Sequence, residues 1–248
     1  MAAWFQNERF WKVFVPYMFN AERMELGKDQ ARQAAELAGI ASGAVLDLCC
    51  GPGRISLPLC EMGFAVTGVD ASPFLLDMAK QRAAEQGITA EFLLMDMREF
   101  VRPQAFELAL NLFTSFGYFE DPADDQRVLA NLRESLKPGG VLVMELMSKE
   151  VLARIHKPAM VEVHADGAML VQQVFIEKSW TRVRSVWTLV RGERAETFEL
   201  EHALYSGREL KDLLLAAGFA SVDVLGGLDG CEYGPKAERL VLVARCAA

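Results

Sequence analysis

The residues of this 248-residue chain that could do chemistry begin in VLDLCCGPGRISL, residues 45–57. A short apolar run leads into Gly51 and Gly53, which allow the backbone to approach a ligand closely and to turn into a helix. The free N–H groups at the start of such a helix favour negative or polar groups. The loop therefore predicts a ligand site, but it does not by itself define the ligand.

Two aspartates further along the chain narrow the choice of ligand. Asp70 ends a second apolar run in VTGVDAS, where its carboxylate can accept both hydrogens of a ribose diol. Asp96 ends a third run in FLLMDMRE, where it can accept from an exocyclic amine while Met97 packs on a base. An aspartate at a strand end also serves as a cap or turn residue. Together with the glycine loop, however, the two aspartates predict a nucleoside ligand.

Two kinds of nucleoside cofactor fit this description. A dinucleotide fold usually has the pattern G-x-G-x-x-G, and Ser56 stands at the third glycine position here. A pyrophosphate also gains from a nearby cation, whereas a sulfonium gains from carboxylates, carbonyls and aromatic faces. The acidic and aromatic surroundings of the loop favour a sulfonium over a nicotinamide cofactor.

The elements that must position these residues follow from the alternation of apolar runs and amphipathic stretches between residues 44 and 147. This alternation is typical of a parallel sheet covered by helices on both faces. The caps Ser72 and Asp121, each followed by proline, predict helix starts, and LKPGG at 136–140 predicts a helix end. The strands are expected at 44–49, 65–69, 90–95, 106–112, 140–146, 219–225 and 238–245.

Two further segments flank this pattern. Residues 7–39 look helical, with an apolar and aromatic face of Phe10, Phe14, Tyr17 and Met18 that either packs or forms a lid over the sheet. Residues 159–204 read as three or four strands without a helix, and Asp166-Gly167 predicts a hairpin. We therefore expect an N-terminal helical lid at 1–43 and an α/β domain at 44–248, interrupted by an antiparallel insertion at about 150–205.

Composition limits the partners and the location. Acidic residues outnumber basic ones 34 to 26, and no basic run forms a phosphate-tracking patch, so we expect no nucleic-acid partner. Without a signal peptide or a membrane-spanning segment, the expected location is the cytoplasm, with no membrane partner. Five irregularly spaced cysteines predict reduced thiols, and no zinc pattern is present. The oligomeric expectation is a monomer or a homodimer.

Several motifs in the same order and spacing resemble those of class I S-adenosylmethionine-dependent methyltransferases: VLDLCCGPGR, TGVDAS, MDMRE, NLFTSFGYF and LKPGGVLVMEL. The resemblance implies a Rossmann-like sheet of seven strands, with the last strand antiparallel, and S-adenosyl-L-methionine as the cofactor. It places the cofactor over the glycine loop, the ribose on Asp70, and the adenine on Asp96 and Met97. The full set of expected cofactor contacts is Tyr17, Arg23, Asp47, Cys49, Gly51, Gly53, Asp70, Ala71, Asp96, Met97, Asn111 and Leu112.

Some of the expected cofactor contacts come from the cysteine pair and from the N-terminal helix. Cys49 stands where many members of the family have a glycine, and we expect an ordinary strand conformation there. Cys49 and Cys50 are interpreted as packing residues because adjacent cysteines form only a strained disulfide. In related enzymes a basic or tyrosyl group of the N-terminal helix binds the methionyl carboxylate, the role assigned to Arg23 and Tyr17. A solvated helix arginine is the alternative for Arg23.

The stretch NLFTSFGYFED, residues 111–121, bears on the acceptor because it follows the fourth strand. Nucleic-acid amino methyltransferases commonly have Asn/Asp-Pro-Pro-aromatic here, so the chain is expected to act on a small molecule. The stretch resembles a segment of amino-sugar N-methyltransferases, and the insertion falls where those enzymes and glycine-type N-methyltransferases carry a substrate cover. This similarity places Tyr118 near the acceptor as the catalytic candidate, with Phe113, Ser115 and Phe116 in its pocket. Helix capping or packing is the alternative for Tyr118.

Methyl transfer is an in-line displacement that needs alignment, exclusion of water and a deprotonated acceptor. An amine loses its proton near neutral pH more readily than an alcohol, so nitrogen is the expected acceptor atom. His156, His164 and His202 lie in or beside the insertion and are either bases or ordinary surface residues. The alternatives are a nicotinamide-dependent oxidoreductase and a non-catalytic protein that binds an adenosyl ligand.

Overall fold

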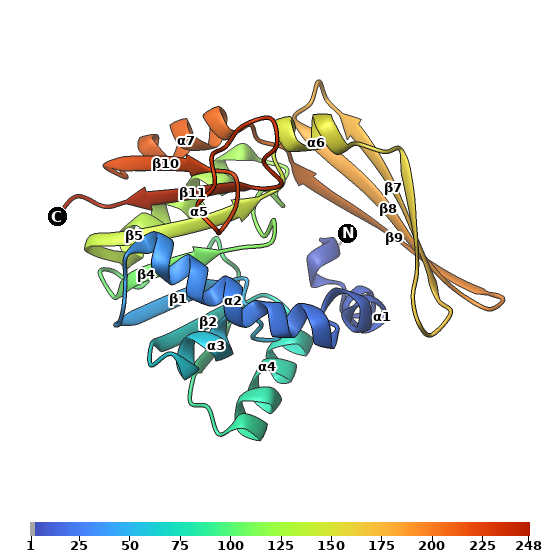
Figure 1. Cartoon of the computed structure of the whole chain (residues 1–248), viewed down its shortest axis with the longest axis horizontal. Coiled ribbons are helices and arrows are strands. Elements are labelled where there is room, and N and C mark those ends of the chain that lie inside the picture. The colour runs from blue at the N-terminus through green and yellow to red at the C-terminus, as the bar shows by residue number, and fades with distance from the viewer. Residues whose placement is uncertain (1–2) are drawn as a thin grey trace.

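A seven-stranded sheet forms the centre of the molecule in the computed structural model, which describes residues 3–248 (Figure 1). Its strands are β1 (Ala44–Leu48), β2 (Ala65–Asp70), β3 (Glu91–Leu94), β4 (Phe106–Asn111), β5 (Leu136–Leu146), β10 (Ser221–Leu225) and β11 (Leu240–Arg245). They lie in the order β10-β11-β5-β4-β1-β2-β3. Strand β11 runs antiparallel to both of its neighbours, and the other pairs described for this sheet are parallel. The predicted, mostly parallel seven-stranded sheet is confirmed.

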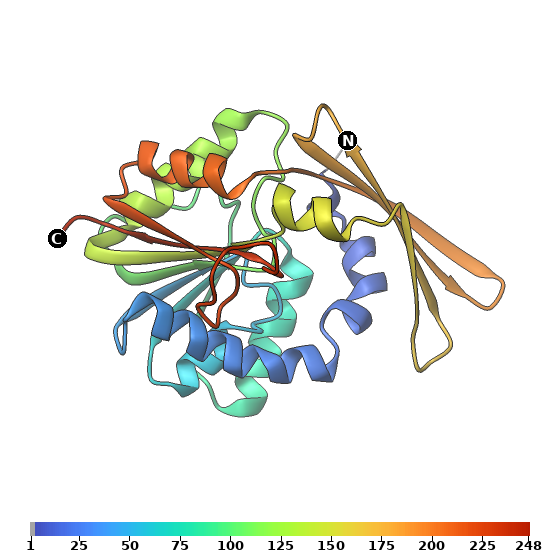
Figure 2. The same ribbon diagram turned by 45° about the horizontal axis from the view of Figure 1, so that its top comes forward.

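Helices cover both faces of this sheet (Figures 1 and 2). Helices α2 and α3 pack on one face through a cluster that contains Ala31, Ala35 and Leu59, and α5 and α7 pack on the other through Leu129 and Leu210. Helix α4 packs along β2 and β3. The bounds are α2 (Ala21–Ala38), α3 (Ser56–Glu61), α4 (Pro73–Gln86), α5 (Pro122–Ser135) and α7 (Gly207–Ala216). Among the described helices, none has the length and apolar content needed to cross a lipid bilayer.

Most helix boundaries follow the local signals in the sequence. The Ser72 and Asp121 side chains accept backbone N–H groups at the starts of α4 and α5, and Ser206 and Glu209 form a capping box at the start of α7. The helix end expected at LKPGG is confirmed, but the strand expected from residue 140 begins earlier. Helix α5 ends at Ser135, and LKPGG is the start of β5, because the Leu136 backbone is already extended. A bulge in the β4–β5 pairing accommodates this early start.

The N-terminal segment forms three elements rather than one continuous helix. They are η1 (Trp4–Gln6), α1 (Glu8–Met18) and α2. The chain breaks at Phe19 because Asn20 has an extended backbone and its side chain caps α2 by accepting from Arg23 N–H. The predicted aromatic face of α1 is buried. Phe10 and Phe14 are 0% exposed and contact the Trp187 and Phe198 rings.

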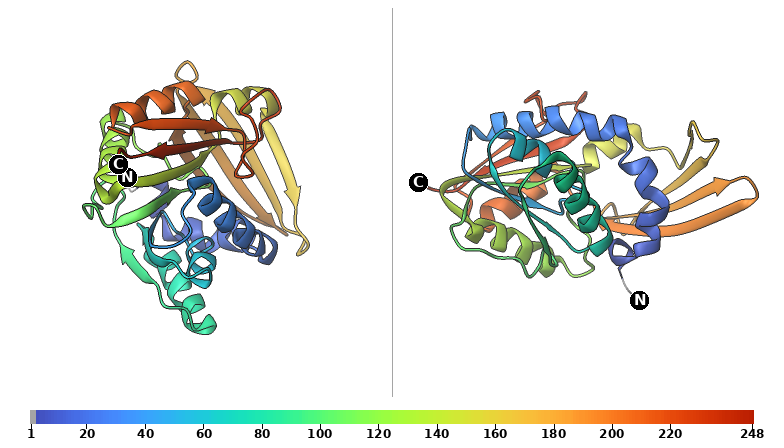
Figure 3. Two further views of the ribbon diagram at one scale, coloured as in Figure 1. Left: turned by 60° about the vertical axis from the view of Figure 1, so that its left-hand side comes forward. Right: turned by 90° about the horizontal axis from the view of Figure 1, so that it is seen from below.

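A second sheet, called the cover sheet below, contains β6 (Ala159–Val163), β7 (Met169–Glu177), β8 (Arg182–Arg191) and β9 (Arg194–Ala203). All of its pairs are antiparallel, as expected for the insertion, and Gly167 lies in the predicted hairpin turn. A short helix, α6 (Lys149–Ile155), precedes it and was not predicted. Figure 3 shows the cover sheet projecting from one end of the α/β layers, beside α1. The Ala203 N–H donates to Gly117 O at 2.6 Å and so anchors the cover sheet to the segment after β4.

Candidate active site

A cavity of about 640 Å³ lies at the carboxyl ends of the central strands, between the α/β layers and the N-terminal elements. The chain order reverses between β1 and β4, which is where an open parallel sheet binds its ligand. Nine of the predicted cofactor contacts line the cavity: Arg23, Asp47, Cys49, Gly51, Asp70, Ala71, Asp96, Met97 and Leu112. The cavity is large enough for a cofactor and a small acceptor side by side.

The glycine loop has the backbone that its sequence predicts. Gly51 and Gly53 have φ values of +54° and +79°, in the left-handed region that favours glycine. Gly51 lines the cavity. Gly53 lies behind the surface of the cavity, where an added Cβ atom would be 3.2 Å from Leu57 Cγ. Gly51 therefore leaves room for a ligand, and Gly53 allows the loop to pack against α3.

The expectation of an ordinary strand conformation at Cys49 was wrong. Its φ is +65°, a left-handed conformation, because the backbone N–H groups of both Cys49 and Cys50 turn to donate to the same Val69 carbonyl, at 2.7 and 3.1 Å. Burial, followed by the charges of Asp70 and Asp47, raises the pKa of the Cys49 thiol well above its usual value. All five cysteines are free thiols in the structure. A buried thiol that stays protonated suits the packing role expected for it.

Asp70 and Asp47 lie on either side of the loop. The two Asp70 carboxylate oxygens accept the Gly51 and Ser72 N–H groups at 2.9 and 2.8 Å, and each keeps lone pairs for a further donor. Asp47 is 3% exposed, and burial raises its pKa to about 6 despite a 2.5 Å hydrogen bond from the Ser56 hydroxyl. Ser56, at the third glycine position, thus supports a carboxylate beside the loop.

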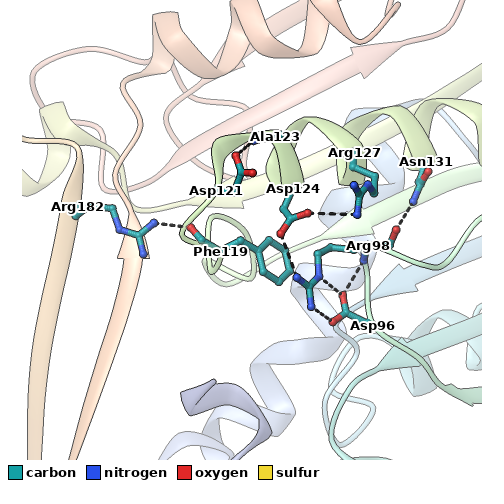
Figure 4. Close-up of polar contacts among 9 residues, drawn as sticks. All are labelled: Asp96, Arg98, Phe119, Asp121, Ala123, Asp124, Arg127, Asn131 and Arg182. Atoms are coloured by element: carbon teal, nitrogen blue, oxygen red, sulfur yellow. Dashed lines mark hydrogen bonds and ion pairs between the residues drawn. The ribbon is translucent and has the colours of Figure 1, made fainter. Parts of the chain in front are cut away.

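Asp96 and Met97 follow β3 and form another part of the cavity wall. Burial would raise the pKa of Asp96, but hydrogen bonds from the Arg98 guanidinium and backbone hold it below its usual value. The Arg98 guanidinium in turn donates to Asp124 and lies over the Phe119 ring, as Figure 4 shows. Arg98, two residues after Asp96, was not among the predicted site residues.

The segment after β4 is strained beside the cavity. Phe113 and Thr114 have φ values of +60° and +61°, a conformation that costs about 1 kcal/mol or more per non-glycine residue. Glu145 stabilises it by accepting the Phe113 N–H at 2.7 Å, and its backbone carbonyl accepts the Thr114 N–H at 3.0 Å. Arg239 pairs with Glu145 and donates to the Thr114 hydroxyl. Glu145 and Arg239 also line the cavity. The only sequence signal for them is their charge, since Glu145 lies within an apolar strand, β5, and Arg239 directly precedes another, β11.

Three predicted residues of that segment have different surroundings. Ser115 lines the cavity as expected. Phe116 does not, because its side chain is fully buried and packs near the Tyr205 ring. Asn111 is also turned away from the cavity. Its amide donates to Leu48 O and Ser115 O at 3.3 and 3.1 Å, which ties the segment to β1.

Tyr118 belongs to an aromatic wall of the cavity. Its ring stacks on Phe5 at 5.4 Å between centroids and meets the edge of Trp4 at 4.9 Å. Burial raises the pKa of its hydroxyl above the usual value. The other rings of this wall are Trp11, Phe119 and Trp187. The sequence could not assign these residues, because η1, α1 and β8 meet only in three dimensions.

Tyr17 and Arg23 have different surroundings. Arg23 lines the cavity near Arg54, whose guanidinium lies 4.0 Å from the centre of the Phe113 ring. Burial, followed by the charge of Arg23, lowers the pKa of Arg54 to about 10. Tyr17 does not reach the cavity. Its hydroxyl donates to Asp166 at 2.8 Å and accepts from Arg191, so it connects α1 to the cover sheet.

The three histidines lie outside the cavity lining defined by residues 3–248. Burial lowers the pKa of His202 to about 4, so this side chain is neutral at pH 7. His164 packs against Tyr17, with 4.2 Å between ring centroids. Within the described part of the chain, no cluster of three or more His, Cys, Asp or Glu residues could hold a metal ion.

The fold and this cavity define the class of protein. A seven-stranded sheet with β11 reversed, a glycine loop after β1 and carboxylates at the ends of β2 and β3 are the features of the class I methyltransferase fold. The residues also fit S-adenosylmethionine, because Gly51 opens the loop to the cavity and the Asp70 oxygens keep free lone pairs beside it.

Comparisons with known proteins agree with this class. Residues 45–140 match the family model described as a methyltransferase domain. The chain is 28% identical over 212 residues to the putative methyltransferase YqeM of Bacillus subtilis, covering 82% of this chain and 84% of YqeM. It is 30% identical over 148 residues to the ubiquinone biosynthesis O-methyltransferase of Caulobacter vibrioides, covering 56% and 57%.

A solved structure with a similar fold is that of CalS10, an amino pentose methyltransferase from Micromonospora echinaspora with S-adenosylmethionine bound. The TM-score is 0.67, the identity is 21%, and the match covers 92% of each chain. Together, the matching domain, the relatives and the similar structure support a class I S-adenosylmethionine-dependent methyltransferase, as the resemblance of the motifs implied.

Proposed function

We propose that this enzyme transfers a methyl group to a nitrogen atom of a small molecule. The observation that carries the proposal is the acceptor side of the cavity, which has aromatic walls and a carboxylate, Glu145, that is already paired with Arg239 and accepts the Phe113 N–H. Among residues 3–248, the histidines lie outside this lining, and burial raises the pKa of the Tyr118 hydroxyl. A protonated amine can lose its proton to solvent near pH 7 and become a good nucleophile, whereas a neutral alcohol needs a base to remove its proton.

The proposed residue roles divide the cavity into two parts. At the cofactor end, Asp70 binds the ribose hydroxyls, and Asp96 with Met97 binds the adenine. Arg23 binds the methionyl carboxylate, and Asp47 supports the loop and the methionyl amine. At the acceptor end, Phe113, Ser115 and Tyr118 surround the nucleophile. Each of these eight residues lines the cavity, which supports the division.

In the proposed mechanism, S-adenosylmethionine supplies an electrophilic methyl group on a sulfonium. The protein aligns the acceptor in line with that methyl group and excludes water. The faces of Tyr118 and Phe113 stabilise positive charge that passes from sulfur to the amine. The carboxylates near the loop add to this stabilisation.

The proposed domain organisation assigns residues 1–43 to a lid, residues 44–248 to the catalytic domain, and residues from about 150 to 205 to a substrate cover. The lining supports it, since Trp4, Phe5 and Trp11 come from the first segment and Trp187 from the third. A small-molecule acceptor suits a cavity closed in this way. The nicotinamide alternative has no support from the loop, because Ser56 replaces the third glycine and binds Asp47.

Methyl transfer from labelled S-adenosylmethionine tests the proposed function. A panel of amino sugars, amino acids, aliphatic amines, phenols and alcohols is incubated with the enzyme, and labelled products are separated. We expect labelled product from at least one amine, with a rate that rises with pH as the amine loses its proton. Labelling of the phenols or alcohols alone would contradict the nitrogen assignment.

A further inference from the structure

Arg98 binds both oxygens of the Asp96 carboxylate. Asp96 Oδ1 accepts from Arg98 Nε at 3.0 Å and from the Arg98 backbone N–H at 2.9 Å, and Oδ2 accepts from Nη2 at 2.8 Å (Figure 4). The side chain of Asp96 is 14% exposed and that of Arg98 is 33% exposed. A two-pronged contact of this kind fixes the plane of a carboxylate as well as its position. Asp96 therefore meets the cavity in one orientation.

Arg98 is itself restrained on three sides. Its Nη1 donates to Asp124 Oδ2 at 3.1 Å, in the first turn of α5. Its guanidinium lies 4.2 Å from the centre of the Phe119 ring, and its carbonyl accepts from Asn131 Nδ2 at 2.9 Å. These contacts come from α5 and from the segment that precedes it, both separate in sequence from β3. Arg98 thus connects Asp96 to α5 and to Phe119, which lines the cavity.

This arrangement decides what Asp96 can bind. An unpaired carboxylate in a cavity would attract any cation, including an ammonium group. A carboxylate already paired with a guanidinium has much of its charge balanced, and its remaining lone pairs suit a neutral N–H donor. The exocyclic amine of adenine is such a donor.

We propose that Arg98 is a positioning residue for the cofactor, which holds the Asp96 carboxylate in the orientation that accepts the adenine amine. The inference rests on the proposed assignment of Asp96 to adenine. It adds that recognition of the base depends on a residue that does not line the cavity.

The relative affinities of the enzyme for two ligands distinguish this positioning role from a purely structural one. S-adenosylhomocysteine carries the exocyclic amine, and S-inosylhomocysteine has a carbonyl oxygen in its place. We expect the wild-type enzyme to bind the adenosyl ligand more tightly in calorimetric titrations. Arg98→Met should weaken the binding of S-adenosylhomocysteine by about tenfold, because the Asp96 carboxylate loses its orientation. The preference for the adenosyl ligand over the inosyl ligand should fall as well. Arg98→Lys, which keeps the charge but not the two-pronged contact, should give an intermediate preference.

Arg127→Met is the matched control. Arg127 also pairs with Asp124, at 3.3 Å, but it makes no contact with Asp96, so both affinities should stay at the wild-type values. Thermal unfolding shows that each variant is folded, and Arg98→Lys replaces Arg98→Met if the latter is not. An unchanged preference in the folded Arg98 variants, or an equal loss for both ligands, would overturn the positioning role. Failure of the wild-type enzyme to bind either ligand would overturn the proposed function and the inference with it.

Discussion

At the scale of single residues, the site depends on carboxylates whose partners are fixed by the protein. Asp70 accepts two backbone N–H groups, Asp47 accepts the Ser56 hydroxyl, and Asp96 accepts the Arg98 guanidinium. The sequence predicted these acids because Asp47 lies in the first motif and Asp70 and Asp96 end apolar runs, but it could not identify their partners. It was wrong about the Cys49 backbone, since no local signal shows that two consecutive N–H groups share one carbonyl.

Asp70 provides a prediction at this scale. We expect Asp70→Ala to weaken S-adenosylhomocysteine binding by about 5- to 150-fold, which corresponds to the roughly 1–3 kcal/mol lost when buried donors have no acceptor. Asp70→Asn keeps the size and one acceptor oxygen and should lose less. Calorimetric titration measures both affinities. Wild-type affinity in a folded Asp70→Ala variant would show that the ribose lies elsewhere.

At the scale of elements, the helices and strands were largely predictable because their caps and periodicity are local. The four-stranded insertion, the Ser206 capping box and the helix starts at Ser72 and Asp121 all follow such signals. The aromatic wall was not predictable, because η1, α1, β8 and the segment after β4 form it jointly. The break between α1 and α2 at Asn20 was not predicted, because the helical pattern of the sequence continues across it.

The first turn of α5 gives a pH-dependent prediction. Asp125 is 1% exposed, and burial raises its pKa to about 6 in the folded state, above its usual value of 3.8, although the Tyr205 hydroxyl donates to it. A raised carboxyl pKa favours the protonated folded state, so this residue costs stability increasingly as pH rises from about 4 to about 6. Asp125→Asn does not titrate and should gain up to about 2 kcal/mol over wild type by pH 7.5, or roughly 4–8 °C in Tm.

Thermal unfolding of both proteins at pH 4.5 and pH 7.5 measures this effect. The difference in Tm between Asp125→Asn and wild type should be larger at pH 7.5. A difference that is the same at both pH values would mean that Asp125 does not titrate differently in the folded and unfolded states.

The docking of the cover sheet gives a second prediction at this scale. Gly117 has a φ of +85°, and an added Cβ atom would be 3.2 Å from the Ala203 side chain and carbonyl. Gly117→Ala should therefore lower the free energy of unfolding by more than the roughly 1 kcal/mol that a left-handed alanine costs. Gly192→Ala is the control, because Gly192 has a φ of +59° with nothing within 4 Å of its added Cβ. Equal losses in denaturant unfolding of the two variants would contradict close packing at Gly117.

At the scale of the whole molecule, one cavity is assembled from the α/β sheet, the N-terminal elements and the cover sheet. The order of motifs along the chain was enough to predict the α/β sheet and the gathering of Asp47, Asp70 and Asp96 around one cavity, because class I methyltransferases place these motifs at matching strand ends. The acceptor end was predicted only in part. Phe113, Ser115 and Tyr118 reach the cavity, whereas Phe116 packs in the core. Tyr17, expected among the cofactor contacts, binds the cover sheet instead. The positions of these side chains depend on how separate elements pack against one another, and the spacing of motifs in the sequence does not determine that packing.

The most direct test of this account is a calorimetric titration of the whole protein with S-adenosylhomocysteine, accompanied by thermal unfolding with and without the ligand. We predict one binding site per chain and a stabilisation of about 2.7 kcal/mol at a ligand concentration 100 times the Kd. The absence of both binding heat and stabilisation in the folded protein would contradict the conclusion that this cavity binds the adenosyl cofactor.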